Sequence, residues 1–121
     1  MNEEIITKED LVRILKSLNI PITECVPEDD NIEAETRICF WEYAWEDMVA
    51  SGKVYNTKVT YQVSVISEYP RCKELLKLKK ILNNANQFPI IQHEKDIENR
   101  RWHSFFSIDV LEEIEIEEDN E

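Results

Sequence analysis

The sequence predicts an α+β domain in which two helices pack on one face of an antiparallel, four-stranded sheet. Two observations predict this class. Two segments repeat apolar residues with the period of a helix, and four segments are rich in β-branched and aromatic residues, one of them with strict alternation. These segments follow in the order α-β-β-α-β-β, and a sheet with both helices on one face would bury every apolar stripe.

The first helix is expected from about Lys8 to Leu18. Thr7 is its predicted N-cap, because Asp10 stands three residues later as in a capping box, and Pro21 follows the end of the pattern. The apolar positions recur at i, i+3, i+4 and i+7, which places one face on a core: Leu11, Ile14, Leu15 and Leu18.

The first hairpin is expected to follow a solvated connection, Ile22 to Glu35, that includes one short extended piece. Thr36 to Trp45 is the first predicted strand, Glu46 to Lys53 the turn, and Tyr55 to Val65 a long, half-buried second strand. Alternation in the first strand predicts that one row faces the core, Ile38, Phe40 and Ala44. It places a second, mostly aromatic row on the other side: Cys39, Trp41, Tyr43 and Trp45.

The second helix is expected from Pro70, at its first position, to about Asn86. Its apolar face carries Leu75, Leu78, Leu82 and Ala85. Lysines line the opposite face at i, i+4 and i+7, and we call them the lysine stripe: Lys73, Lys77 and Lys80.

The last two strands are expected at Phe88 to Glu94 and at Trp102 to Val110, with a turn over Lys95 to Arg101. Residues 1–114 then form a single α+β domain. Residues 115–121 form an acidic tail with too few apolar residues to join a core, so we expect them to extend into solvent. One face of the last strand is apolar, with Trp102, Phe106, Ile108 and Val110.

The net charge of −12 arises from 26 acidic and 14 basic residues, and it is concentrated in two runs. Six acids and no base lie between Ser17 and Thr36, and seven acids and no base lie from Glu112 to Glu121. The rest of the chain is nearly neutral. Direct, sequence-specific nucleic-acid binding is disfavoured, because phosphate contacts need clustered lysine and arginine.

Other classes of protein are disfavoured by simple features. No stretch approaches a membrane span, and the acidic start, Met1 to Glu4, is unlike a secretory signal, so we expect a cytoplasm-like location. The single glycine, Gly52, excludes glycine-rich nucleotide loops. No cofactor is expected. Three widely spaced cysteines indicate reduced thiols rather than a disulfide framework: Cys25, Cys39 and Cys72.

No catalytic or metal site is predicted. His93 and His103 lie at similar distances from the last turn and could face each other, with Glu94 or Asp96 as a third metal ligand. Surface histidines are the better interpretation. Cys72, at the start of the second helix, could have a stabilised thiolate, but no base can be placed beside it.

We expect the apolar surface of the aromatic row to be buried either by core packing or by an assembly interface. A homo-oligomer is the natural supposition. The lysine stripe is either a solvated face or a contact for an acidic loop or tail of the next copy. The candidate oligomer or partner interface therefore comprises the three large aromatic residues, two residues of the predicted turn and the stripe: Trp41, Tyr43, Trp45, Asp47, Lys53, Lys73, Lys77 and Lys80.

Four segments resemble small tail-completion, or tail-terminator, proteins of long-tailed bacteriophages and prophages. They are CFWEYAWEDMVASG (39–52), VTYQVSVISEYPR (59–71), KLKKILNNA (77–85) and WHSFFSIDVLEEI (102–114). In element order the resemblance covers about residues 8–114. The motifs are patterns of strands and helices rather than chemical signatures.

The resemblance implies a non-enzymatic virion protein, present in the host cytoplasm during assembly. It implies a ring, often hexameric, that ends the tail tube and docks to the head connector, with contacts through sheet edges and the long hairpin loop. Its partners would be its own copies, tail-tube proteins and head-connector proteins. The alternative is an acidic inhibitor or DNA mimic that acts on a basic partner.

Overall fold

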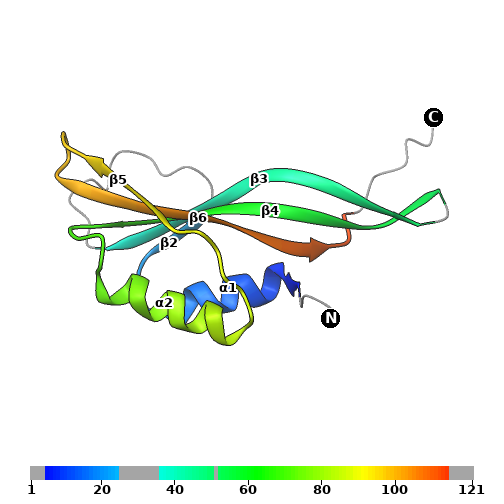
Figure 1. Cartoon of the computed structure of the whole chain (residues 1–121), viewed down its shortest axis with the longest axis horizontal. Helices are drawn as coiled ribbons and strands as arrows, with labels where there is room; N and C mark the ends of the chain where they lie inside the picture. Colours follow the sequence, from blue (N-terminus) through cyan, green and yellow to red (C-terminus); the bar gives the residue numbers. More distant parts are fainter. Residues whose placement is uncertain (1–4, 25–35, 51, 115–121) are drawn as a thin grey trace.

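The computed structural model describes residues 5–24, 36–50 and 52–114. These residues form two helices and one mixed sheet, in the order β1 (Ile6–Thr7), α1 (Lys8–Lys16), β2 (Ile22–Glu24), β3 (Arg37–Ala50), β4 (Lys53–Ser67), α2 (Lys73–Asn84), β5 (Gln92–Asp96) and β6 (Arg101–Glu112). Both helices lie on the same side of the sheet (Figure 1). The α+β class and the placement of both helices are therefore confirmed.

The sheet is larger than predicted and is not purely antiparallel. Its strand order is β1-β6-β4-β3-β2, and β5 pairs with β6 on the edge that β1 also uses. The two additional strands run parallel to their neighbours: Ile6 pairs with Val110, and Ile22 with Ile38. The expected four-stranded antiparallel sheet was incomplete, because β1 and β2 have only two and three residues and are held by partners far along the chain.

The first helix is capped as predicted. The Asp10 backbone N–H donates to the Thr7 hydroxyl at 3.1 Å, and the Thr7 N–H donates to the Asp10 carboxylate at 3.1 Å. The helix ends at Lys16 and not at Leu18, although Leu18 is still buried. The short extended piece expected after it is β2, whereas the acidic residues 25–35 lie outside the described part of the chain.

The second helix begins three residues later than predicted. Cys72, and not the residue before Pro70, is its N-cap, and no side chain caps the helix there. Pro70 lies in the turn that joins β4 to the helix. The last hairpin is also shifted: β5 starts at Gln92 rather than Phe88, and the turn shortens to four residues between Asp96 and Arg101.

The hydrophobic core lies between the two helices and the sheet. Leu11 and Leu15 of α1 and Leu78 of α2 are fully buried against the central strands. The face of β6 predicted to be apolar is the face that packs there. The core residues are Leu11, Leu15, Leu18, Ile38, Phe40, Val59, Tyr61, Val63, Val65, Leu75, Leu78, Leu82, Phe106, Ile108 and Val110. Neither described helix is long and apolar enough to cross a membrane.

Candidate functional site

The predicted turn from Glu46 to Lys53 is instead part of two long strands. β3 continues to Ala50 and β4 begins at Lys53, so the connection is only two residues long. Gly52 adopts a φ of +75°, a backbone conformation that glycine reaches without the steric cost of a side chain. Polar residues of β3 are satisfied across the hairpin: Lys58 forms an ion pair with Glu46 at 2.8 Å.

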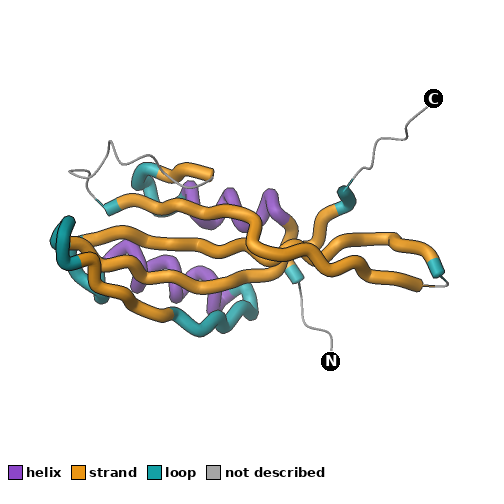
Figure 2. Tube along the Cα trace, turned by 90° about the horizontal axis from the view of Figure 1, so that it is seen from above, coloured by secondary structure: helices purple, strands orange, loops and turns teal. Residues whose placement is uncertain are grey.

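The tip of this hairpin forms an arm that extends beyond the rest of the sheet. The last pair between β4 and β6 is Thr57 with Glu112, whereas β3 and β4 continue to pair up to Ala50 with Lys53. We call residues 48–50 and 52–56 the arm. Figure 1 and Figure 2 show the arm extending well past both helices. An isolated pair of strands has little core of its own, so this region is suited to contact a partner.

A β-bulge at Tyr43 changes which side chains of β3 share a face. Glu42 pairs with Tyr61 and Ala44 pairs with Thr60, so Tyr43 is an extra residue without a partner on β4. Trp45 then pairs with Val59, a core residue on the helix side of the sheet. The predicted row of Trp41, Tyr43 and Trp45 on one face is therefore wrong, because strict alternation ends at the bulge.

The aromatic residues of β3 are nevertheless exposed. Tyr43 is 67% exposed and Trp45 is 61% exposed, as is Val49 of the arm, whereas Trp41 is half-buried. The Trp45 indole Nε1 donates a hydrogen bond to the Glu42 carboxylate at 3.0 Å. This bond satisfies the only polar atom of the indole and leaves its apolar surface in solvent.

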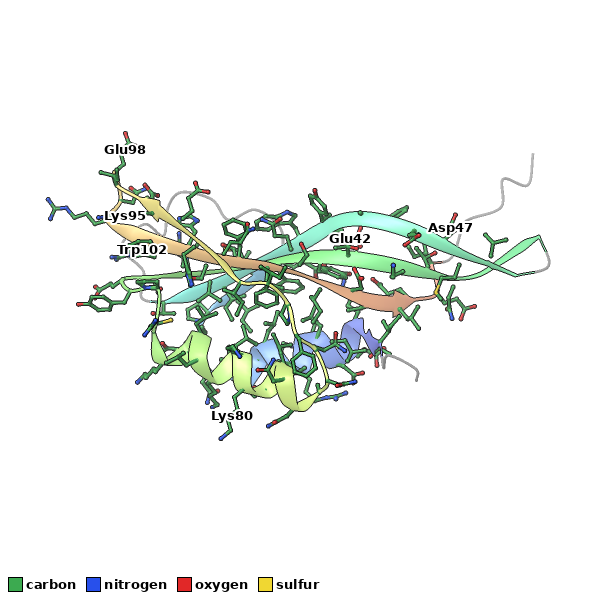
Figure 3. The ribbon with its side chains drawn as sticks, viewed as in Figure 1. Glu42, Asp47, Lys80, Lys95, Glu98 and Trp102 are labelled. Atoms are coloured by element: carbon green, nitrogen blue, oxygen red, sulfur yellow. The ribbon has the colours of Figure 1, made fainter. Side chains whose placement is uncertain are left out.

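The outer edge of β3 is largely free of a partner strand. β2 pairs only with Ile38, Cys39 and Phe40. Over residues 41–50, no strand in the described part of the chain pairs on that side, and we call these residues the β3 edge. Backbone N–H and C=O groups along a free edge are a template for another strand. Figure 3 shows Glu42 and Asp47, two acidic residues of this edge, along the strand.

A polar cluster joins the start of α1 to the strands beside the β3 edge. The Tyr61 hydroxyl donates to the Glu112 carboxylate at 2.9 Å, and the Lys8 ammonium donates to Glu24 at 2.9 Å. Lys8 also lies 5.6 Å from the centre of the Tyr61 ring. Burial, followed by the bond to Glu112, raises the pKa of Tyr61, and the bond to Glu24 raises the pKa of Lys8. Sequence reasoning missed this cluster because its members come from four separate elements.

The lysine stripe is exposed on α2, as expected of a solvated face. Lys80 points away from the sheet (Figure 3). Its neighbour Lys79 is also exposed and donates to the Asn83 side chain at 2.8 Å. Of the two remaining predicted interface residues, Asp47 accepts a hydrogen bond from the Thr57 hydroxyl at 3.3 Å, and Lys53 begins β4 at the end of the arm.

The two histidines do not face each other. His93 pairs with Ser104, and His103 pairs with Glu94, so the rings lie on opposite faces of the β5–β6 hairpin. His93 Nδ1 lies 2.8 Å from the hydroxyl of Ser104, which is fully buried and thus inaccessible to a substrate. His103 Nε2 lies 3.7 Å from Asp96, whose pKa is lowered mainly by hydrogen bonds from Asn99. The possible metal site formed by both histidines is thereby excluded.

Cys39 and Cys72 are free thiols, and Cys25 lies outside the described residues. Burial raises the pKa of the Cys39 thiol, which favours its unreactive, protonated form. Cys72 is half-buried beside the core, consistent with a packed thiol.

No protein-family model and no curated protein matches the sequence. Among solved structures, the chain is similar to the PVC sheath/tube terminator of an extracellular contractile injection system in its extended state. The identity is 11% and the TM-score is 0.34 over 92% of this chain. The chain spans 58% of the length of that structure.

Proposed function

We propose that the protein is a non-enzymatic assembly component of a phage-like tail, and that it forms a ring that terminates the tail tube. The observation that carries this proposal is the surface made by the β3 edge and the arm. It combines a free strand edge with exposed aromatic side chains such as Tyr43 and Trp45, and both features are typical of surfaces that bind other protein chains. The four sequence segments that resemble tail terminators support the same role.

Within the ring, we infer that copies contact each other heterologously, because a head-to-tail contact of fixed rotation closes into a ring. The lysine stripe would lie against an acidic surface of the next copy. The tail tube on one side, and the head connector on the other, are the expected partners in a virion.

Light scattering after size exclusion, with and without purified tail tubes, tests the proposal. We expect closed rings, either alone or once tubes are added, and electron microscopy should then show rings at tube ends. A protein that stays monomeric and does not bind tail tubes would overturn the proposed function.

The contribution of the lysine stripe is tested by charge reversal. The triple variant K73E/K77E/K80E should prevent ring assembly in sedimentation velocity, because all three side chains are exposed and reversal replaces attraction by repulsion. Lys16→Glu, on the exposed side of α1, serves as a control. Normal assembly of the triple variant would exclude the stripe as a ring contact.

The alternative, an acidic inhibitor that resembles DNA, predicts a different result. Deletion of residues 115–121, which include five acids, should strongly weaken binding of a mimic to a basic enzyme. The same deletion should leave ring assembly largely intact.

A further inference from the structure

The β3 edge is the longest free strand edge among the described residues. It offers residues 41–50, which follow directly on the stretch that β2 covers. Among the described strands, β5 pairs only with β6, so its outer edge is free over Gln92 to Asp96, and the gap on β6 between its pairings with β5 and β1 offers only Phe106 to Asp109. A strand of ordinary length has five or six residues, so the β3 edge can accept a whole strand and the β6 gap cannot.

The side chains of the β3 edge are acidic or apolar. The edge contains three acids, Glu42, Glu46 and Asp47, and no lysine or arginine, and of these acids Glu46 already forms an ion pair with Lys58 of β4. Between these acids lie exposed apolar side chains, Tyr43 and Trp45. Opposite charges on adjacent strands stabilise a pair, whereas like charges destabilise it. Glu42 and Asp47 pair with Tyr61 and Thr57 and therefore share a face with Trp45, so a matching strand carries its basic residues on that face.

Among the described strands of a second copy, β2, β3 and β5 do not supply such a strand, and the end of β4 beyond its last pair with β6, residues 53–56, is shorter than a strand of ordinary length. Two β3 edges placed side by side would bring their acidic residues together. The exposed strand β5 carries Glu94 and Asp96 against a single base, Lys95, and β2 carries only an acid, Glu24. The lysine stripe of α2 is basic, but it lies on a helix and cannot pair with a strand edge.

We propose that the β3 edge binds an extended, lysine- or arginine-bearing segment of a different protein by adding it to the sheet as a strand. Backbone hydrogen bonds to residues 41–50 supply affinity, and the acids select for a basic sequence. Trp45, which shares their face, packs on the aliphatic stems of the basic side chains. This inference rests on the proposed function, because it specifies how an assembly partner is held.

A synthetic peptide of about ten residues that alternates lysine with valine and threonine is a suitable probe. Amide hydrogen exchange should show new protection at the outward-facing amides of residues 41–50. Tryptophan fluorescence should change on titration, since Trp45 becomes covered. The same peptide with glutamate in place of lysine should bind at least about tenfold more weakly, because two or three exposed charge pairs are lost.

Charge reversal on the edge should invert this preference. The variant E42K/D47K should weaken binding of the lysine peptide about tenfold and should bind the glutamate peptide instead. The control variant E94K/E98K changes the net charge equally, but its side chains lie at the β5–β6 hairpin, where Figure 3 shows Glu98. This control should bind the lysine peptide nearly as wild type does. Circular dichroism confirms that both variants fold.

Three results would overturn the inference: no binding of the lysine peptide, equal losses in both variants, or protection at Phe106 to Asp109 without protection on β3. These results are distinct from a failure of the proposed function. If rings still form and bind tube ends while the lysine peptide leaves β3 unprotected, the tail role stands and only the basic-strand partner is lost.

Discussion

The two halves of the β3–β4 hairpin are built from similar residues but are stabilised in different ways. In the half next to β2, Ile38 and Phe40 face the helices and are at most 3% exposed. In the other half, beyond the bulge, Trp45 and Val49 are both 61% exposed. Apolar content alone thus does not determine burial. What differs is whether a helix lies above the strand, and the uncovered half retains surface that a partner can bury.

The largest expected effect is a loss of stability when α2, which packs against the covered half, loses a core side chain. Leu78→Ala should lower the free energy of unfolding by about 3 kcal/mol, because it removes buried methyl groups and leaves a cavity under the sheet. Chemical denaturation at neutral pH measures the change. Trp45→Ala is the matched truncation in the uncovered half and should change stability by less than about 0.5 kcal/mol. Equal losses in the two variants would contradict the distinction between the halves.

An intermediate effect is expected where the two halves meet. Tyr61→Phe removes the hydroxyl that donates to Glu112 but keeps the buried ring. The free energy of unfolding should fall by about 1 kcal/mol, the usual net contribution of one hydrogen bond. Hydrogen exchange should become faster at residues 57–61 and 108–112, while exchange under the helices stays slow. A variant as stable as wild type would show that this bond does not help to hold the arm.

The smallest expected effect on stability comes from the capping box at the N-terminal end of α1, and it depends on pH. Hydrogen bonds from the Thr7 backbone and hydroxyl lower the pKa of Asp10 below its usual value of 3.8. The ionised carboxylate therefore stabilises the folded state above pH 3.8, and this contribution is lost as the pH falls through the lowered pKa. The stability difference between wild type and Asp10→Asn should shrink on acidification. Thermal melts over a pH series would measure it, and a difference that grows in acid would argue against the capping box.

Local patterns in the sequence were sufficient to predict the covered part of the fold. The first helix was correct to within two residues because Thr7 and Asp10 interact over three positions, and the helical periods identified its buried leucines. The α+β class follows from the same patterns. The short parallel strands could not be predicted in this way, because the partner of Ile6 is Val110 and nothing near either residue indicates the pairing.

The segment from Glu46 to Lys53 was predicted as a turn because it contains Ser51-Gly52 and several polar residues. In the folded protein, Lys58 and Thr57 on the opposite strand satisfy the two acids of this segment, so their polarity does not end the strand. The bulge has no sequence signal of its own, since Tyr43 is an ordinary strand residue. Tyr43 and Trp45 were predicted as interface residues from the sequence. The faces of the sheet on which they lie were not predicted correctly, because the bulge changes the alternation.

The bulge absorbs a change in chain length without a change of register. Every pair from Ala44 to Met48 is the pair that a regular ladder would make if position 43 were absent. Deleting Tyr43 would therefore close the bulge and leave the faces of residues 44–48 as they are, while it removes one exposed aromatic side chain. The loss of a single codon here thus changes the exposed surface without moving the rest of the strand, which gives evolution a route to a different neighbour that does not pass through an unstable core.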